Sequence, residues 1–390
     1  METGKKKKLL VTASTFPRWE GDTEPRFVLD LSRYLAEYFD VTVLAPAAPG
    51  AEKREEMEGV HVVRYHYFPI HGWETLCYPG AIVPRIKEKK IRLLLVPFLL
   101  LSLYIKLAGI LSDYDLVHAH WLIPQGVIQS LFRKPYIVTG HGGDVASLNK
   151  GLLKRCKARC IRKACRVTVV SEQLKSKLQE LAPDADPDVI SMGVDTEKFG
   201  RQHYVPDYFG QNGKKVVLFV GRLAEKKGVT YLIEAMKEVD AVLAVAGDGP
   251  LRKELEEQAV PIRDKVMFLG AKTHDELKIL YASADIFAAP SVTAEDGDQE
   301  GMPTTIMEAM ASGIPIVSTK SSGIMQLIDD GENGLLCEEK NISRLAENIN
   351  RLLENEQLCR QLVKNGLETV REYDYSVIAE RYKEILYGIL

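Results

Sequence analysis

The feature that most constrains the fold is a pattern that occurs twice. Near the start, the basic run Lys5–Lys8 leads into the apolar run Leu9–Thr12, and Lys214 and Lys215 lead in the same way into Val216–Val220. Strand-like and helix-like segments alternate after each run, which predicts a parallel sheet covered by helices on both faces. A chain of 390 residues also exceeds what one hydrophobic core usually organises. We therefore expect two α/β domains.

The domain boundaries follow from where the pattern restarts. We expect a first domain over residues 1–195, a linker over 196–213 in a stretch rich in Gly, Asp and Pro, and a second domain over 214–372. An amphipathic helix over 373–390 ends the chain. Strands are expected at 9–12, 41–44, 60–65, 116–119 and 136–139, and then at 216–220, 241–246, 266–269, 286–289 and 316–318. Ligands of such sheets bind at the carboxyl ends of the strands.

The net formal charge of −3 is unevenly distributed. Up to Lys198 the chain has 29 Lys and Arg against 23 Asp and Glu, and after it 22 against 31. A basic half can bind nucleic acid, but neither a reader motif nor interleaved aromatic residues accompany the basic runs. We therefore exclude nucleic acid as a partner. We expect the basic N-terminal domain to face an anionic acceptor or an anionic membrane surface.

The longest apolar run, Leu93–Ile105, has thirteen residues, contains Pro97 and is followed by Lys106. A spanning helix needs about 20 apolar residues, so we expect this run not to cross a bilayer. Its basic lead-in suits an amphipathic segment lying on anionic lipid, and equally a buried helix behind a solvated stretch. No secretory signal precedes the first strand, and the six cysteines show no framework spacing. We expect a cytoplasmic protein with reduced thiols, peripheral on the membrane if the first interpretation holds.

The most informative stretch runs from Glu300 to Pro315 and begins in a loop after an apolar strand. Pro303 suits the first turn of a helix, because its φ is preset. Glu300 is then expected in the loop, and Glu308, eight residues later, inside the helix. The free N–H groups and the dipole of a helix start form a receptor for phosphate. An ordinary helix with acidic residues near its start is the alternative.

Two further loops are expected at the carboxyl edge of the second sheet. Gly221–Gly228 follows the first strand of that domain and carries Arg222 and Lys227. An arginine can grip two phosphate oxygens and a lysine adds a mobile charge, so the pair can neutralise a departing diphosphate without a metal ion. The next strand is followed by Gly247, Asp248 and Gly249. These glycines let the backbone approach a ligand, although the third glycine of GxGxxG is missing, and solvated turns are the alternative for both loops.

In the first domain, the loop Thr139–Asp144 places His141 among glycines at the end of a β-branched strand. A histidine there can donate a hydrogen bond to a sugar hydroxyl or transfer a proton, although many loop histidines are structural. His118 and His120 lie two residues apart at another strand end, and therefore on one face. No third metal ligand accompanies them, so we expect them to line the ligand cleft without binding a metal.

Together and in this order, these motifs resemble glycosyltransferase family 4, retaining enzymes of the GT-B fold with a Glu-x7-Glu motif that Glu300 and Glu308 match. The resemblance implies two Rossmann-like domains whose parallel sheets face a central cleft, with a C-terminal helix crossing back to the first domain. It also implies that Glu300 approaches the donor sugar, that Glu308 holds the ribose and that His141 contacts the transferred sugar. Arg222 and Lys227 would then bind the diphosphate. The other implied pocket residues are Gly301, Met302, Pro303, Thr304, Gly247, Asp248 and Gly249.

The implied activity is transfer of a hexose from a UDP- or GDP-sugar to a lipid-linked glycan or glycolipid, in polysaccharide biosynthesis at the cytosolic membrane face. The nucleotide sugar is a substrate, and we expect neither a cofactor nor a metal ion. A preorganised Arg, Lys and helix start would stabilise the charge on the leaving diphosphate. One alternative is a metal-dependent transferase with an Asp-x-Asp motif at Asp184 and Asp186 or at Asp296 and Asp298. The other is a non-catalytic module that binds nucleotide sugars.

Overall fold

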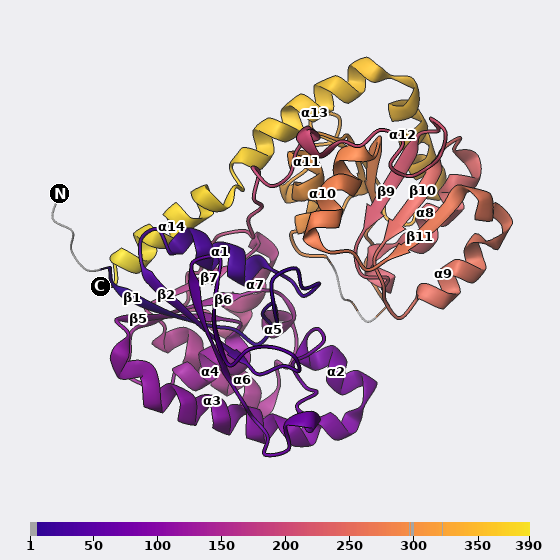
Figure 1. Ribbon diagram of the computed structural model, residues 1–390. Helices are drawn as coiled ribbons and strands as arrows, with labels where there is room; N and C mark the ends of the chain where they lie inside the picture. The colour runs from indigo at the N-terminus through magenta and orange to yellow at the C-terminus, as the bar shows by residue number, and fades with distance from the viewer. Residues whose placement is uncertain (1–5, 296, 298–299, 322) are drawn as a thin grey trace. The chain divides into compact units, whose positions relative to one another are not determined.

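The computed structural model describes residues 6–295, 297, 300–321 and 323–390, and the chain divides into two units (Figure 1). The first unit consists of Met1–Ser191 together with Ile378–Leu390, and the second of Met192–Val377. Residues 196–213, which we expected to form a linker, lie within the second unit. Phe199 belongs to its hydrophobic core, and the Arg201 guanidinium donates two hydrogen bonds to the carbonyl oxygen of Gly313.

The sheet of the first unit has eight strands in the order β3-β4-β2-β1-β5-β6-β7-β8. All neighbouring strands are parallel except β3 and β4. The strands are β1 (Lys8–Thr12), β2 (Asp40–Pro46), β3 (Arg54–Met57), β4 (Val60–Tyr65), β5 (Leu116–His120), β6 (Tyr136–Gly140), β7 (Arg166–Val169) and β8 (Asp188–Val189). The central strands are apolar on both faces, because helices cover both faces.

The helices of the first unit are α1 (Phe27–Leu35), α2 (Ile82–Glu88), α3 (Val96–Ile110), α4 (Val127–Gln129), α5 (Gly143–Ala146), α6 (Gly151–Lys163) and α7 (Glu172–Leu181). Helices α3, α4 and α6 lie side by side (Figure 1). The C-terminal helix α14 (Tyr375–Tyr387) starts in the second unit and crosses to the first. There the Tyr382 hydroxyl lies 3.2 Å from the hydroxyls of both Thr139 and Thr168, and the ring of Tyr387 stacks on Phe39 at 4.9 Å.

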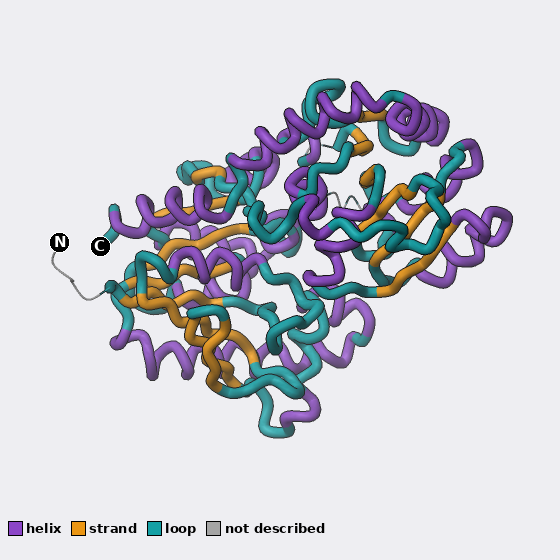
Figure 2. Tube along the Cα trace, turned by 45° about the horizontal axis from the view of Figure 1, so that its top comes forward, coloured by secondary structure: helices purple, strands orange, loops and turns teal. Residues whose placement is uncertain are grey.

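The sheet of the second unit is entirely parallel, in the order β11-β10-β9-β12-β13-β14. Figure 2 shows strands in orange and helices in purple. Its strands are β9 (Val216–Val220), β10 (Val242–Ala246), β11 (Val266–Gly270), β12 (Ile286–Ala289), β13 (Ile316–Thr319) and β14 (Leu335–Cys337). Successive side chains of a strand point to opposite faces. Val216 and Leu218 of β9 accordingly join one core, and Val217 and Phe219 join another.

Helices cover both cores of the second unit. They are α8 (Val229–Ala235), α9 (Arg252–Ala259), α10 (His274–Ser283), α11 (Thr304–Ala311), α12 (Ile342–Glu354) and α13 (Glu356–Arg371). Helices α10 and α11 contribute to the core of Val216 and Leu218, and α8, α9 and α12 contribute to the other. Helix α13 contributes Val370 to the first core and Leu362 to the second. Strands β9, β10 and β12 all end in loops at one edge of this sheet, where parallel sheets bind ligands.

The apolar run near residue 100 differs from our expectation. Helical turns continue without a break from Lys90 to Asp113, giving 24 residues that are long and apolar enough, by length and composition, to cross a membrane. The apolar run Leu93–Ile105 underestimates the length of this helix, because 3₁₀ turns on either side of α3 extend it. Only 22% of its most apolar window is buried.

Candidate functional site

The loops at the carboxyl edge of the second sheet pack directly on one another. Gly228, at φ +65°, precedes α8, and a Cβ there would lie 1.9 Å from the carbonyl oxygen of Pro290, which follows β12. Gly247, at φ +144°, follows β10, and its Cβ would lie 1.9 Å from the carbonyl oxygen of Gly221. Both positions therefore need glycine for packing alone. The contacts hold the loops after β9, β10 and β12 together.

Lys227 and Glu300 form an ion pair at this edge. Lys227 lies in the 3₁₀ turn Glu225–Lys227, and its ammonium contacts the carboxylate of Glu300 in the loop before α11. Only 16% of the Lys227 side chain and 12% of the Glu300 side chain are exposed. Burial raises the pKa of Glu300, but the charges of Lys227 and Lys226 outweigh it and hold that pKa below its ordinary value. The carboxylate is therefore ionised at neutral pH.

Arg222 is an exposed cation on the loop after β9. Its neighbour Leu223 donates its backbone N–H to the carbonyl oxygen of Asp248 at 2.9 Å, which ties this loop to the one after β10. Within the described part of the chain, the guanidinium of Arg222 itself has no hydrogen-bond or ion-pair partner. It can therefore grip an anion with two N–H groups at little cost in broken contacts.

Helix α11 begins after the loop that carries Glu300. We expected Pro303 in the first turn of this helix. It is instead the extended residue before the helix, with ψ 113°. No side chain among the described residues caps this helix start. The first N–H groups of an α-helix lack acceptors within the helix, so those of Thr304 and its neighbours can serve an anion.

Glu308 lies in α11 as predicted and is 7% exposed. Its carboxylate accepts a hydrogen bond of 2.8 Å from the hydroxyl of Tyr281, a fully buried residue of α10. Burial, and then the Glu308 charge, raise the pKa of Tyr281 well above its ordinary value. Tyr281 thus stays protonated and fixes one carboxylate oxygen of Glu308. We did not identify Tyr281 from the sequence.

The structure therefore brings Glu300 together with Lys227, and it places the other predicted residues of the second domain on adjacent loops or, for Thr304 and Glu308, in α11. Gly301 and Met302 are partly exposed between Glu300 and α11, and Met302 packs against the core; Thr304, the first residue of α11, is also partly exposed. The Asp248 carboxylate accepts the backbone N–H of Gly249 at 2.7 Å. His141 belongs to the first unit.

His141 follows β6 and is half-buried among three rings. The ring centroids of Phe27, His120 and Trp121 lie 5.1, 5.1 and 5.0 Å from that of His141. Asp144 closes the loop, because its carboxylate accepts the backbone N–H groups of His141, Gly142 and Leu122 at 2.8 to 3.0 Å. We did not single out Asp144, although an Asp that hydrogen bonds to its own turn is typical of such loops.

Three neutral histidines continue inward from this loop. His120 Nδ1 lies 2.9 Å from His141 Nε2, and His118 Nε2 lies 2.8 Å from Thr139 Oγ1. Burial lowers the pKa of His118 and of His141 to about 3 and also lowers that of His120. We expected His118 and His120 to line the ligand cleft. They are at most 1% exposed and therefore lie inside the unit.

The hydrogen-bond partners of these histidines assign their tautomers. Nε2 of His120 and Nδ1 of His118 are buried without a partner among the described residues. A buried N–H without an acceptor is costly, whereas a bare ring nitrogen costs less. His120 therefore donates from Nδ1 to His141 Nε2, and His141 carries its own proton on Nδ1. That N–H is the donor that His141 can offer to a ligand.

Metal ligation was the alternative for several acidic and histidine residues. No group of three His, Cys, Asp or Glu residues that could hold a metal ion occurs within residues 6–295, 297, 300–321 and 323–390. Asp186 is 88% exposed and pairs with Lys175 at 2.9 Å on the surface of the first unit. Asp296 and Asp298 lie outside the described residues.

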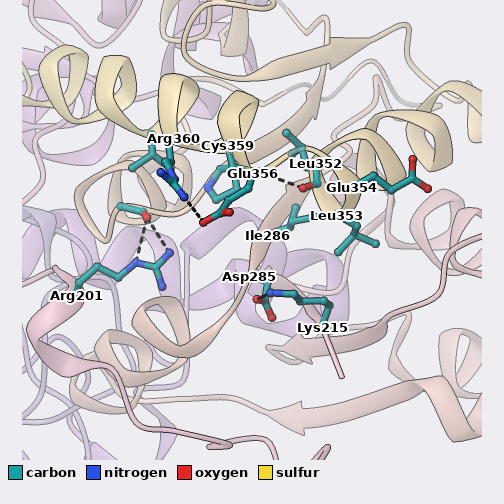
Figure 3. A pocket seen from close by; sticks show the side chains of 13 residues that line it. Arg201, Lys215, Asp285, Ile286, Leu352, Leu353, Glu354, Glu356, Cys359 and Arg360 are labelled. Carbon is teal, nitrogen blue, oxygen red and sulfur yellow. Dashed lines mark hydrogen bonds and ion pairs between the residues drawn. The ribbon is translucent and has the colours of Figure 1, made fainter. Parts of the chain in front are cut away.

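A pocket of about 350 Å³ lies at the opposite, amino edge of the second sheet (Figure 3). Lys215 and Asp285 in its wall precede β9 and β12 and pair with each other at 2.8 Å. Glu356 and Arg360 of α13 pair at 2.6 Å, and the nearby Arg201 donates to backbone carbonyls. Most of its charge is thus neutralised within the wall, which makes it a poorer receptor for an anion than the carboxyl edge.

Two α/β units with parallel sheets are the architecture of GT-B glycosyltransferases, and the comparisons with known proteins agree. Residues 25–198 match the family model Glycosyltransferase Family 4, and residues 204–369 match Glycosyl transferases group 1. The chain belongs to glycosyltransferase family 4.

Individual relatives cover most of the chain. An uncharacterised glycosyltransferase of Methanocaldococcus jannaschii is 30% identical over 302 residues, which are 70% of this chain and 76% of the relative. A Bacillus subtilis protein named as a teichuronic acid biosynthesis glycosyltransferase is 30% identical over 272 residues, 66% of each chain. The structure of HepE from Anabaena in complex with UDP aligns with a TM-score of 0.73 at 21% identity, over 98% of this chain and 100% of HepE. This likeness supports the assigned fold.

Proposed function

We propose that this glycosyltransferase is a retaining, metal-independent hexosyltransferase that takes its sugar from a UDP- or GDP-linked donor. The proposal rests on the grouping at the carboxyl edge of the second sheet, where exposed Arg222, the buried pair Lys227–Glu300 and the uncapped start of α11 occur together. Two cations and a helix start can bind a diphosphate without a cofactor. The complex of HepE with UDP supports a nucleoside diphosphate as the ligand.

In the proposed reaction, the acceptor hydroxyl attacks the anomeric carbon on the face from which the diphosphate leaves. A bond forms between the acceptor oxygen and that carbon, while the bond from the carbon to the diphosphate oxygen breaks and its electron pair stays on that oxygen. The same oxygen takes the proton of the acceptor hydroxyl. Arg222 and Lys227 stabilise the charge that develops there, which can lower the barrier by several kcal/mol.

The remaining site residues orient the donor. Glu300 is ionised and accepts hydrogen bonds, so it can hold both the Lys227 ammonium and a sugar hydroxyl. Glu308 keeps one carboxylate oxygen on Tyr281 and offers acceptor capacity to the ribose hydroxyls. His141 contributes the N–H at Nδ1 to the transferred sugar.

We further propose a lipid-linked glycan as the acceptor, at the cytoplasmic face of a membrane. The teichuronic acid name of the Bacillus subtilis relative supports a role in polysaccharide biosynthesis. Helix α6 in the first unit supports an anionic neighbour, because it contains no acidic residue and exposes five cations to solvent. They are Lys154, Arg155, Arg159, Arg162 and Lys163.

The proposal is tested by donor binding and by product analysis. Thermal unfolding of the full chain with UDP-, GDP- and other nucleotide sugars identifies the donor, because a ligand of the native state raises Tm. With that donor, Arg222→Ala should lower kcat at least about tenfold, since removing one charge-stabilising donor typically costs more than that. Arg263→Ala, an 82% exposed arginine of the same unit, is the matched control. An inverted anomeric configuration in the product, or absence of both transfer and donor hydrolysis, would contradict the proposal.

A further inference from the structure

One face of helix α3 is apolar and exposed. Leu99, Leu103 and Leu107, four residues apart, are at most 1% exposed and pack into the first unit. The opposite stripe also follows helical spacing, and its side chains are 43 to 68% exposed. This stripe, which we call the α3 face, consists of Ile91 and Leu94 in the 3₁₀ turn Lys90–Leu95 and of Phe98, Leu101 and Ile105 in α3. A helix that is apolar all round is normally buried in protein or in lipid, and this one is buried in protein on one side.

Aromatic side chains extend the α3 face at both ends. Phe98 packs edge-on against Phe68 at 4.9 Å, and Phe68 stacks with Trp73, which is 61% exposed. Towards the other end, Tyr104 stacks on Phe132 at 5.0 Å. Exposed Trp and Tyr rings are typical of surfaces that lie at the boundary between lipid headgroups and acyl chains.

Cations flank the α3 face at both ends. Lys89 and Lys90 are exposed before it. At the far end, burial and the nearby charges of Arg54 and Lys53 lower the pKa of Lys106, so three cations lie close together there.

Two acidic residues, Glu88 and Asp113, border this segment, and Glu88 is neutralised. The Glu88 carboxylate lies 2.8 Å from Arg85 and 2.9 Å from Arg92. The sequence from Lys89 to Ser112 contains no acidic residue. Between these two borders the charged residues of the segment are all cations, which suits an anionic partner.

A bilayer surface fits this combination better than the other occupants. Spanning would require lipid around the whole helix, but the Leu99 stripe is part of the core of the first unit. A symmetric contact with a second copy would bring identical cationic flanks together, which is unfavourable.

We infer that the α3 face inserts into the headgroup region of a bilayer that contains anionic lipids and holds the protein there as a monotopic membrane protein. Apolar burial and the attraction of the flanking cations would act together, as they do for interfacial helices. The inference deepens the proposed function, since it names the surface that brings the enzyme to a lipid-linked acceptor. It does not require that catalysis occurs as proposed.

The test is co-sedimentation of the full chain with vesicles of phosphatidylglycerol and phosphatidylcholine, and with phosphatidylcholine alone. Leu94→Glu/Leu101→Glu removes apolar insertion, and Lys89→Glu/Lys90→Glu reverses two flanking charges. Each variant should weaken binding to the anionic vesicles at least about tenfold. The lysine variant loses two cations, each of which contributes roughly a factor of five near an anionic surface, and the leucine variant loses two inserted apolar side chains. Val260→Glu, a 61% exposed apolar position in the second unit, is the matched control and should bind like wild type.

Nucleotide-induced changes in Tm separate this inference from the proposed function, because all four changed positions of the two variants lie outside the second unit. Variants that lose vesicle binding but keep the wild-type Tm and nucleotide response support the inference. Wild-type protein that stays in the supernatant at low salt overturns it. So does a wild-type dimer that Leu94→Glu/Leu101→Glu converts to monomer, since a second copy would then cover the α3 face.

Discussion

The pair of Lys227 and Glu300 makes a prediction that separates donor binding from catalysis. Glu300→Gln removes a negative charge beside a lysine whose side chain is only 16% exposed. Two unit charges about 4 Å apart interact by roughly 4 kcal/mol at an effective dielectric constant of 20, and partial solvent exposure reduces this to about 1 kcal/mol. Lys227 without Glu300 should therefore bind a diphosphate roughly five times more tightly.

Turnover should change in the opposite direction. Glu300 is the carboxylate proposed to orient the donor sugar, so Glu300→Gln should lower kcat at least about tenfold, as loss of positioning usually does. Isothermal titration with the product nucleotide, UDP or GDP, measures binding without contributions from the sugar. A steady-state assay with the nucleotide sugar measures kcat.

Two variants serve as comparisons for Glu300→Gln. Glu338→Gln breaks a surface pair with Lys320 in the same unit and should change neither quantity. Arg222→Ala should weaken nucleotide binding and lower kcat together. Glu300→Gln protein that binds the nucleotide as weakly as Arg222→Ala protein would refute the assigned roles, because Glu300 would then act on the diphosphate itself.

Three further predictions concern packing, pH and metal ions. Gly228→Ala should cost about 3 kcal/mol in the free energy of unfolding. Gly59, at φ +81° with no atom within 4 Å of its Cβ, is the control, and Gly59→Ala should cost about 1 kcal/mol. Equal losses of unfolding free energy for the two variants, measured by urea titration, would refute the close approach of residue 228 to Pro290. Folded His118, with a pKa of about 3, binds fewer protons than the unfolded chain, so stability should fall below about pH 6.5 by up to 1.4 kcal/mol per pH unit. His118→Asn should flatten that dependence in urea titrations. Transfer should persist in excess EDTA, and its loss with recovery on adding Mn²⁺ would favour the metal-dependent alternative.

Much of the fold could be predicted because the central strands are short apolar runs followed by loops. Strand β9 and its neighbours are buried on both faces, so their sequences are almost continuously apolar. Strand β3, Arg54–Met57, has three charged residues out of four and pairs only at the sheet edge, and β8 has two residues. Neither gives a hydrophobic pattern, so sequence periodicity could not reveal them.

The unit boundary and the long apolar helix show a different limit. Gly, Asp and Pro around residues 196–213 correctly indicate irregular backbone, but composition does not say which core that backbone packs against, and Phe199 packs against the second. The apolar helix continues at both ends through 3₁₀ turns, and these contain Lys90 and Arg92 before α3 and Asp113 after it, residues that a count of apolar positions leaves out.

Part of the site follows from strand ends, and part depends on contacts between distant residues. The order of strands and loops was enough to place Arg222, Lys227 and Glu300 at one edge of a sheet. The hydrogen bond from Tyr281 to Glu308 joins residues 27 apart on two helices, and the sequence carries no periodic signal for such a pair. The tautomers of His120 and His141 likewise depend on which ring nitrogens are buried.

The central claim is that the second unit binds a nucleoside diphosphate at the carboxyl edge of its sheet. A crystal structure of the full chain with UDP or GDP, whichever raises Tm, tests this most directly. We predict density for the diphosphate beside Arg222 and Lys227 and against the N–H groups at the start of α11. A nucleotide bound instead in the pocket of Lys215 and Arg201 at the opposite edge would contradict the claim.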